Sequence, residues 1–241
     1  MTGLIQAAIN GRRSKAEHPA IPVTPEEQAA AAAQAVAAGA GAIHVHVRAA
    51  DETESIVGTD VSNAVTAIRA AAPGTPVGVS TGAWILRDER RRLEAVRGWT
   101  VLPDYASVNF DEAGATELAE LLRSRGIGIE AGLANSRGAE ILADSGLGGR
   151  CLRMLLEPDD LDVDTALRAL AHVEAILDRA RITVPRLLHG VGPTAWPLID
   201  AAAARHYDTR VGFEDTLTLP DGARAPSNAA LVAAARRRAR G

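Results

Sequence analysis

The stretch Ile43-His44-Val45-His46-Val47 alternates apolar side chains with imidazoles. Such alternation predicts a β-strand, because successive side chains of a strand point to opposite faces. His44 and His46 then share one face, while the three apolar residues pack behind them. The stretch therefore predicts a strand with one apolar face, against which helices can pack, and two metal ligands on the other face.

Seven further apolar runs alternate with longer alanine-rich segments that carry arginine and glutamate. This pattern predicts repeated βα units and a parallel sheet. Thr24-Pro25-Glu26-Glu27, for example, supplies a helix cap, a proline at the first helical position and two acids ahead of an alanine run. No linker divides the chain, so we expect an α/β fold, a single-domain (β/α)8 TIM barrel over residues 1–241. The eight predicted strands are residues 4–10, 41–47, 76–81, 105–110, 127–131, 152–156, 186–190 and 209–214.

Composition narrows the class of protein. The chain has 241 residues and a formal net charge of −4, which argues against a nucleic-acid partner. The first residues do not resemble a signal peptide, and no apolar run approaches the ~20 residues that span a bilayer, so no membrane partner is expected. The single cysteine, Cys151, excludes an intrachain disulfide and fits a reducing compartment. We expect a cytoplasmic protein.

Polar residues gather toward the carboxyl ends of the predicted strands, on the face that points into the barrel. Enzymes with this fold place their chemistry at that end. Buried polar groups cost free energy unless they are paired, solvated or bound to a ligand. A site is therefore predicted at this rim, with Asn10, His44, His46, Ser80, Ser107, Asn109, Glu130, Arg210 and Glu214 as candidates.

A metal site is the first hypothesis for this rim. Glu214, from the last predicted strand, can join His44 and His46 in a three-ligand site that leaves a position open for substrate. Two imidazoles and a carboxylate suit Zn²⁺, although manganese, cobalt or iron would accept the same set. The alternative is that the histidines are hydrogen-bonded core residues.

Asp215, next to Glu214, is a candidate general base beside a polarised carbonyl. Arg210 lies ~13 Å down the strand at ~3.3 Å per residue, so it can help only if its side chain runs toward the rim. Gly212 would leave that path open. The alternatives are a loop acid for Asp215 and a structural ion pair for Arg210.

Other rim residues are candidate substrate contacts. Ser80, Thr81, Ser107, Asn109 and Glu130 offer hydrogen-bond donors and acceptors. No Gly-x-Ser-x-Gly turn is present, so Ser80 is expected to position an oxyanion or a substrate carboxylate rather than act as a nucleophile.

Two loops are candidate anion sites. The basic loop Asn10-Gly11-Arg12-Arg13-Ser14-Lys15 follows the first predicted strand, and it is also consistent with a solvated surface. His189-Gly190-Val191-Gly192-Pro193 stands where barrels often bind phosphate. Glu157, at the end of the sixth predicted strand, is either rim scaffold or an acid that supports the site.

Together, several motifs resemble the β-keto acid cleavage enzymes, typified by the 3-keto-5-aminohexanoate cleavage enzyme. The resemblance extends over nearly the whole chain. Its motifs are Ala8-Ile9-Asn10-Gly11, Pro22-Val23-Thr24-Pro25-Glu26-Glu27, Ile43-His44-Val45-His46, Val79-Ser80-Thr81-Gly82, Ser107-Val108-Asn109, Glu130, Arg210-Val211-Gly212-Phe213-Glu214-Asp215 and Ser227-Asn228-Ala229.

The resemblance implies a zinc-dependent barrel that takes a β-keto acid and acetyl-CoA and returns acetoacetate and a new CoA thioester. One Zn²⁺ per chain would be held by His44, His46 and Glu214, with acetyl-CoA as co-substrate. Relatives generally assemble as homo-oligomers, so a homo-oligomer is expected.

By matching positions, the resemblance also assigns roles in the reaction. Asp215, supported by Arg210, would abstract the C2 proton of the keto acid. Ser80, Ser107 and Asn109 would position the substrate or its oxyanion. A metal ion that spreads enolate charge makes a carboxylate base sufficient for this step.

This chain departs from the family pattern at two named positions and in length. Val47 stands where many relatives have proline. Arg13 stands where members that act on amino-bearing substrates carry glutamate, which predicts a substrate whose side chain is neutral or bears a carboxylate. The chain is also shorter than most members around the fourth to sixth predicted strands, which bears on the CoA-binding surface.

Three other functions are compatible with parts of the pattern. A metal-dependent aldolase or lyase would use the same enolate chemistry without CoA. Amidohydrolases also use a strand His-x-His, but usually on the first strand and with further histidines on middle strands. A non-catalytic barrel that senses or stores a small acid would bind without turnover.

Overall fold

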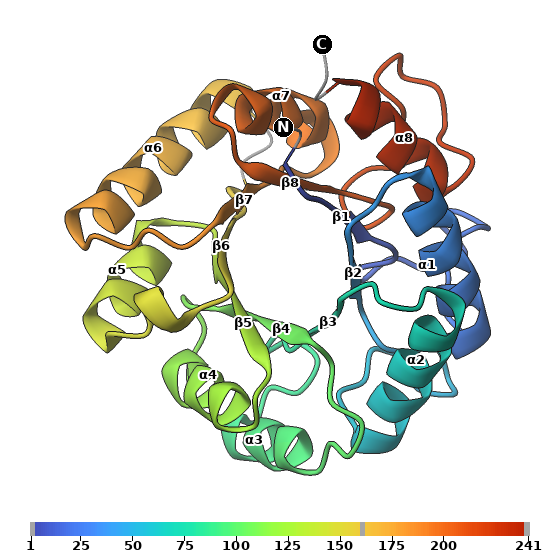
Figure 1. Cartoon of the computed structure of the whole chain (residues 1–241), viewed down its shortest axis with the longest axis horizontal. Coiled ribbons are helices and arrows are strands. Elements are labelled where there is room, and N and C mark those ends of the chain that lie inside the picture. The colour runs from blue at the N-terminus through green and yellow to red at the C-terminus, as the bar shows by residue number, and fades with distance from the viewer. Residues whose placement is uncertain (1–2, 160–161, 239–241) are drawn as a thin grey trace.

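The computed structural model describes residues 3–159 and 162–238, which form a closed parallel barrel inside a ring of helices (Figure 1). The strands follow one another in chain order, and β1 pairs with β8 to close the barrel. The predicted (β/α)8 barrel is thus confirmed. The strands are β1 (Ile5–Ala8), β2 (Ala42–Val45), β3 (Val77–Ser80), β4 (Tyr105–Asn109), β5 (Gly128–Leu133), β6 (Arg153–Leu156), β7 (Arg186–Leu188) and β8 (Asp208–Val211).

A helix follows each strand and covers the outside of the barrel (Figure 1). Helix α1 begins as the sequence predicts: the Thr24 hydroxyl accepts a hydrogen bond from the Glu27 amide, and the Glu27 carboxylate accepts one from the Thr24 amide. The helices are α1 (Pro25–Ala38), α2 (Gly58–Ala71), α3 (Glu89–Arg97), α4 (Ala115–Ser124), α5 (Ser136–Ser145), α6 (Val163–Arg179), α7 (Ala195–Ala204) and α8 (Asn228–Arg238), with short 3₁₀ turns η1 (Gly148–Arg150) and η2 (Gly192–Thr194).

The strands that carry the candidate metal ligands end earlier than predicted. His46, Glu214 and Asp215 lie in the segments that follow β2 and β8, not within the strands. The prediction of a last strand over residues 209–214 is wrong because the backbone turns after β8, where the Gly212 carbonyl accepts a hydrogen bond from the Asp215 amide at 2.9 Å. The turn places two neighbouring acids at the rim.

Gly212 allows this turn to lie against β1. A Cβ atom at this position would stand 1.9 Å from the carbonyl oxygen of Ala8. The sequence suggested that this glycine leaves a path for the Arg210 side chain, but the structure gives a different reason. The missing side chain lets the backbone after β8 approach the backbone of β1.

The interior of the barrel, toward the amino ends of the strands, holds a polar layer made of Gln6, Tyr105, Glu130 and Arg153, all buried. Glu130 Oε1 accepts a hydrogen bond from Gln6 Nε2 at 2.7 Å and lies 3.3 Å from Arg153 Nε. Gln6 also donates to the Tyr105 hydroxyl at 2.9 Å, and that hydroxyl donates to the Ile43 carbonyl at 2.7 Å. The layer pairs the buried charges of Glu130 and Arg153, although Gln6 Oε1, Glu130 Oε2 and Arg153 Nε have no hydrogen-bond partner among the described residues.

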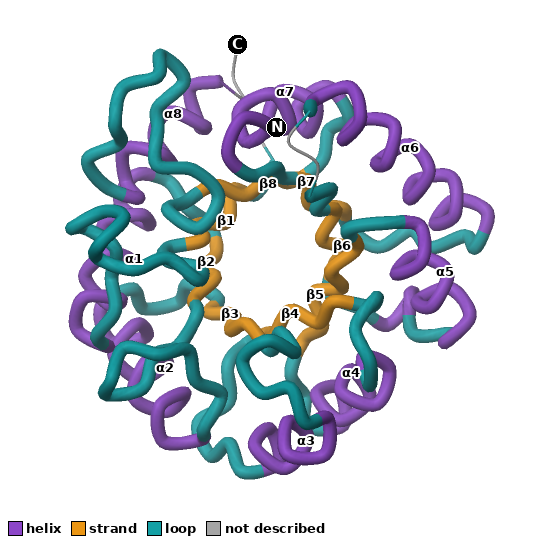
Figure 2. Tube along the Cα trace, turned by 180° about the vertical axis from the view of Figure 1, so that it is seen from behind, coloured by secondary structure: helices purple, strands orange, loops and turns teal. Residues whose placement is uncertain are grey.

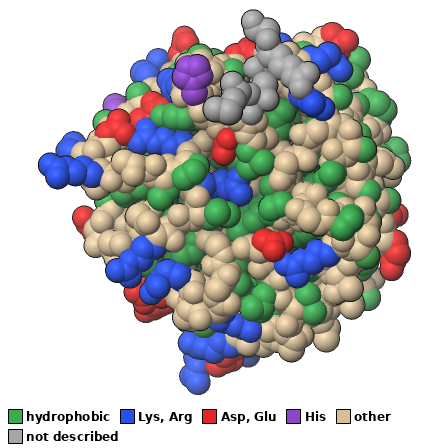
Figure 3. All heavy atoms as spheres, viewed as in Figure 1, with side chains coloured by type: hydrophobic (Ala, Val, Ile, Leu, Met, Phe, Trp, Pro, Cys, Tyr) green, Lys and Arg blue, Asp and Glu red, His purple; other side chains and the backbone are tan. Residues whose placement is uncertain are grey.

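Long loops follow β1, β2 and β8, at residues 9–24, 46–57 and 212–227. Figure 2 shows loops gathered on the side of the barrel near β1 and β2. Among the described residues, no helix combines the length and apolar character needed to cross a membrane. On the face seen in Figure 3, acidic and basic side chains are interspersed around the edge, with apolar side chains between them.

Candidate active site

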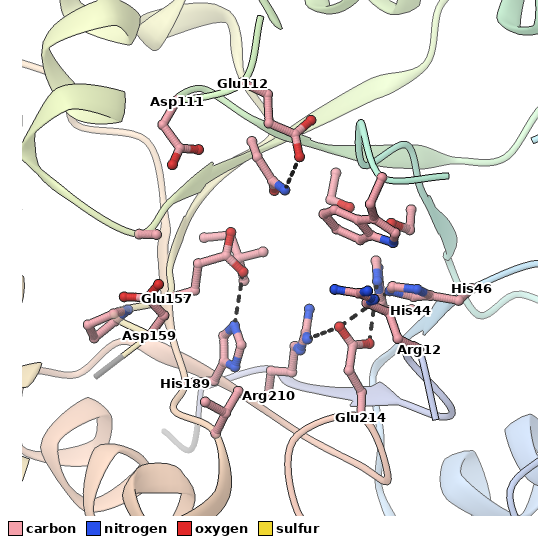
Figure 4. Close-up of a pocket in the computed structure, with 18 residues that line it drawn as sticks. Arg12, His44, His46, Asp111, Glu112, Glu157, Asp159, His189, Arg210 and Glu214 are labelled. Atoms are coloured by element: carbon pink, nitrogen blue, oxygen red, sulfur yellow. Dashed lines mark hydrogen bonds and ion pairs between the residues drawn. The ribbon is translucent and has the colours of Figure 1, made fainter. Parts of the chain in front are cut away.

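A cavity of about 450 Å³ lies at the carboxyl ends of the strands and is lined mainly by polar and charged side chains (Figure 4). Its volume is in the range of small-molecule sites, ~300–1,000 Å³. Residues from distant parts of the chain meet here because strand ends of a barrel share one rim. The predicted site residues on its wall are His44, His46, Ser80, Ser107, Asn109, Arg210 and Glu214.

The three predicted metal ligands converge in this cavity. Glu214 Oε1 lies 3.3 Å from His46 Nε2, and Glu214 Oε2 lies 3.6 Å from His44 Nε2. One ligand atom from each residue falls within 4.8 Å of the others. Glu214 Oε2 is buried and has no hydrogen-bond partner among the described residues, so a cation at this point would satisfy it. Two imidazoles and one carboxylate fit a Zn²⁺ site.

Gly11 makes room for this arrangement. Its φ of +57° is a left-handed conformation that side chains rarely adopt, and a Cβ atom would stand 2.4 Å from Glu214 Cγ. The glycine after β1 therefore lets the Glu214 side chain reach the histidines.

Glu54 and Trp84 orient His46, and neither was singled out from the sequence. Glu54 Oε1 lies 2.6 Å from His46 Nδ1, while Trp84 Nε1 donates to both carboxylate oxygens at 3.1 Å. A carboxylate on Nδ1 keeps the proton there and leaves Nε2 free to bind a metal. Glu54 lies in the loop after β2, where no local pattern marks it.

The local charges set the protonation of the ligands. Burial lowers the pKa of His44 well below its usual value. Burial also opposes charge on His46, but Glu214 and Glu54 outweigh it and raise the pKa of His46 to about 9. Burial would raise the pKa of Glu214, yet Arg210 and the two imidazoles hold it well below the usual value. Glu214 is therefore ionised and His44 neutral, the forms that bind metals, whereas His46 is protonated near neutral pH and must release a proton when a metal binds.

Arg210 joins the two acids that follow β8. Its Nη2 atom lies 2.5 Å from Glu214 Oε1 and 3.0 Å from Asp215 Oδ1, and its Nε atom donates to the same Asp215 oxygen at 3.2 Å. The side chain does run toward the rim, as the hypothesis requires. Burial disfavours its charge, but Asp215 and Glu214 outweigh burial and raise the pKa of Arg210.

His189 is a further cavity residue whose contacts the sequence did not predict. It follows β7, is 2% exposed, and its Nδ1 atom lies 3.2 Å from Asp215 Oδ1. Its Nε2 atom lies 3.4 Å from Oε2 of Glu157, which also lines the cavity (Figure 4). The sequence did place His189 at the carboxyl end of a predicted strand, but the segment that it begins was interpreted as a phosphate-binding turn.

That turn is occupied by the protein's own contacts. The Gly192 amide donates to the Asp215 carbonyl at 2.7 Å, and the Val191 amide donates to the Thr194 hydroxyl at 3.1 Å. Two amides that a phosphate would need are therefore already used.

Asn10 and Thr81 hold the backbone instead of facing the cavity. Asn10 is fully buried: its Nδ2 atom donates to the carbonyls of Pro22 and His46, and its Oδ1 atom accepts from the His46 amide at 2.9 Å. Thr81 donates to the Ser107 carbonyl at 2.6 Å. Their polar atoms bond to the backbone of neighbouring segments, and their contact with substrate stays a prediction.

Glu130 and Arg13 are also absent from the cavity lining. Glu130 belongs to the polar layer beneath it. Arg13 donates to the Glu214 carbonyl at 3.4 Å and pairs with Glu17 at 2.9 Å. Substrate contact by these two residues, and the substrate charge inferred from Arg13, therefore stay predictions that the cavity lining does not support.

Two other cations of the basic loop after β1, Arg12 and Lys15, lie in different surroundings. Arg12 lines the cavity mouth, with 70% of its side chain exposed and its guanidinium 5.5 Å from the centre of the Trp84 ring. Lys15 pairs with Glu27 at 2.5 Å. Of these two cations, Arg12 alone is among the cavity residues.

Comparisons with known proteins give the family and the fold. A model of the beta-keto acid cleavage enzyme family matches residues 3–141 and 162–241. No curated protein matches the chain. The apo structure of ObcA is 20% identical, with a TM-score of 0.69 over 91% of this chain and 61% of that chain. A ternary complex of ObcA with C4-CoA adduct and oxalate is 20% identical, with a TM-score of 0.69 over 91% of this chain and 63% of that chain.

A second type of barrel also resembles the chain. Tryptophan synthase subunit alpha from Legionella pneumophila is 13% identical, with a TM-score of 0.61 over 99% of this chain and 93% of that chain. At such identities the solved structures support the fold alone, and this chain spans only 61–63% of the length of the two ObcA chains described above. The family model, by contrast, matches most of the sequence, and the chain therefore belongs to the beta-keto acid cleavage enzyme family.

Proposed function

We propose that this protein cleaves a β-keto acid with acetyl-CoA, giving acetoacetate and a new acyl-CoA. Membership of the family supports this reaction. The observation that carries the proposal is the convergence of His44, His46, Glu214 and Arg210 at one cavity. Asp215 is bonded to Arg210 but is itself buried and absent from the cavity lining. ObcA, which shares the fold, has been solved with oxaloacetate and with a CoA adduct, and we propose keto acid and CoA thioester ligands of this kind here.

The metal proposed is Zn²⁺, held by His44, His46 and Glu214. When bound, such a cation polarises the keto and carboxylate oxygens of the substrate and stabilises negative charge that develops on them. Glu54 would keep the His46 Nε2 atom directed at the site, since its carboxylate holds the Nδ1 proton.

Asp215 is the proposed base, and two hydrogen bonds from Arg210 hold its carboxylate in place. Removal of the C2 proton leaves an enolate, whose carbon forms a bond to the thioester carbonyl and releases the CoA thiolate. The thiolate then adds to the keto carbonyl, the bond between C2 and C3 breaks, and the acetoacetate enolate takes a proton back. Ser80, Ser107 and Asn109 line the cavity and are proposed to donate hydrogen bonds to the substrate and its oxyanion.

The mouth of the cavity is the proposed approach for CoA. Arg12 is exposed there, and a guanidinium suits phosphate oxygens. We also propose a homo-oligomer, as is general among relatives. A cytoplasmic location is proposed because the lone Cys151 is buried and unpaired, as in a reducing compartment.

The test combines metal analysis with a screen of β-keto acids in the presence of acetyl-CoA, following acetoacetate release. We expect about one Zn²⁺ per chain and turnover that requires acetyl-CoA. Asp215→Asn should reduce turnover by about 10²–10⁴-fold, the usual contribution of a general base. Cleavage that proceeds equally well without acetyl-CoA would favour the metal-dependent aldolase or lyase instead.

A further inference from the structure

A groove of about 690 Å³ lies at the end of the barrel opposite the candidate active site. It is formed by the segments that precede β7 and β8, two paired strands that both begin at this end. The helices that lead into these segments, α6 and α7, are neighbours in the outer ring (Figure 1). The groove shares no lining residue with the cavity at the carboxyl ends of the strands. It is therefore a feature of the molecule that the proposed function does not use.

Two helix ends beside the groove carry residues that do not suit their backbone. Arg181, after α6, has a φ of +56°, and His206, after α7, has a φ of +58°, a left-handed conformation that favours glycine. In both turns the amide of the next residue donates to the carbonyl five residues before it, at 2.9 Å. The same bond closes α1 and α4, where glycine, Gly39 and Gly126, takes the left-handed position. The chain thus places a less favourable, basic residue at the two helix ends that line the groove.

These two side chains also supply the positive excess of the groove. Two further arginines line it, but each is paired with a carboxylate. Arg186 pairs with Asp178. Arg205 pairs with Glu174 at 3.1 Å. Within the described part of the chain, neither basic residue at the helix ends takes part in an ion pair. The groove therefore offers one unbalanced guanidinium and an imidazole to an anion.

The rest of the groove is largely apolar and aromatic. Its lining includes Ile182, which is buried, and the neighbouring Val184 and Pro185. Tyr207 also lines it, and hydrogen bonds to Glu174 at 3.0 Å and from Arg186 at 2.8 Å fix the phenol. A guanidinium suits phosphate oxygens, whereas the apolar wall suits an organic group attached to them. The lining thus matches a ligand with an anionic end and an apolar body.

We propose that this groove is a binding site for a small organic phosphate. Arg181 and His206 contact the phosphate oxygens, and the apolar wall contacts the body of the ligand. The unfavourable backbone at these two residues is the cost of presenting both side chains to one ligand, since backbone strain of this kind persists where a side chain has a function. The site is independent of the proposed acyl transfer.

A labelled tyrosine reports binding at the groove itself. The chain has two tyrosines: Tyr207 lines the groove, and Tyr105 is buried in the polar layer of the barrel. Protein that contains fluorotyrosine is titrated with ADP and followed by ¹⁹F NMR, with Tyr207→Phe to assign the signals. We expect ADP to shift the Tyr207 signal until it saturates and to leave the Tyr105 signal in place. Adenosine, which lacks the phosphates, should bind roughly tenfold more weakly or less, and added salt should weaken ADP binding.

Glycine variants separate ligand binding from a structural role. Arg181→Gly and His206→Gly remove the side chains and give each turn its preferred residue. We expect each to weaken ADP binding by about three- to fivefold, and the double variant by about tenfold or more. The melting temperature should stay unchanged or rise by about 2–4 °C per variant. Arg123→Ala is the control, because Arg123 is exposed in the last turn of α4 and absent from the groove, and it should bind ADP as the wild type does.

Four results would overturn the inference. The first is a Tyr207 signal that ADP does not shift, and the second is adenosine that binds as tightly as ADP. The third is an unchanged ADP affinity in the double variant, which would place the bound ADP elsewhere, for example at the mouth of the cavity. The fourth is a lower melting temperature in both glycine variants, which would mean that the basic residues serve the helix ends, where cations stabilise the helix dipole. Failure of the acyl-transfer assay would reject the proposed function and leave this site untouched.

Discussion

The contact between Glu54 and His46 predicts how strongly this protein holds its metal. Glu54→Gln replaces the carboxylate that lies 2.6 Å from His46 Nδ1 and accepts from Trp84 Nε1. The amide offers one accepting oxygen instead of two, so its NH₂ group must face either the indole N–H or the imidazole. If it faces the imidazole, it favours a proton on Nε2, the nitrogen needed by the metal.

The expected loss follows from this contact. Carboxylates that orient metal-binding histidines contribute about 10- to 100-fold to metal affinity. That range corresponds to about 1.4–2.7 kcal/mol, close to the ~1.5–3 kcal/mol of a hydrogen bond to a charged group. The Glu54 side chain is only 13% exposed, so solvent should not erase the effect.

Zinc affinity is measured by competition with a chromophoric chelator at fixed pH. Glu112→Gln is the matched control, because Glu112 also lines the cavity but contacts Asn109, Arg92 and the Ala83 amide. We expect the control to bind zinc within about threefold of the wild type, since it leaves the contacts of the ligands intact. A Glu54→Gln protein that binds zinc as tightly as the wild type would refute the conclusion that Glu54 orients His46 for the metal.

The remaining predictions concern stability. Gly212→Ala should destabilise the fold by more than ~2 kcal/mol, because its Cβ would meet the Ala8 carbonyl at 1.9 Å. Gly149→Ala, where a Cβ has open space, is the control and should be nearly neutral. Chemical denaturation measures the free energy of unfolding of both variants, and equal values would contradict the argument from the Ala8 contact. Burial raises the pKa of Cys151 from 9.0 to about 12, so the native thiol stays protonated while the unfolded thiol ionises. Unfolding free energy should therefore fall as the pH rises above 9, and Cys151→Ala should lack this part of the decrease. Zinc removal by a chelator should lower the melting temperature, and addition of zinc should restore it.

The fold was predictable because its signal is local and repeated. Each apolar run and each amphipathic segment points independently to a βα unit, and eight of them close one barrel. The end of β8 was not predictable, because the turn after Gly212 depends on close approach to Ala8, which is distant in the sequence.

The candidate site was predictable in part. His44, His46 and Glu214 stand at strand ends, so the geometry of a barrel brings them together. Asn10 and Glu130 carry the same inward polar signal, yet they bond to other parts of the protein. A sequence pattern gives the direction of a side chain, but it does not reveal whether another polar group is already there to meet it.

Glu54 and His189 illustrate the opposite problem. Glu54 acts through a loop whose path is set by long-range contacts, including hydrogen bonds from the Arg48 guanidinium to the carbonyls of Gly11 and Arg13. His189 was visible at a strand end, but its meaning depends on Asp215 from the next strand unit. Both roles come from partners that no local pattern identifies.

The polar layer also limits how this barrel can change over evolutionary time or in the hands of an engineer. Replacing Glu130 by leucine would leave the Arg153 cation and a Gln6 amide donor stranded in the interior, a loss of several kcal/mol by analogy with other broken buried pairs. Exchanging Gln6, Tyr105, Glu130 and Arg153 together for aliphatic side chains avoids that penalty. These four positions should therefore vary as a coordinated block among descendants of this sequence, even though none of them lines the cavity.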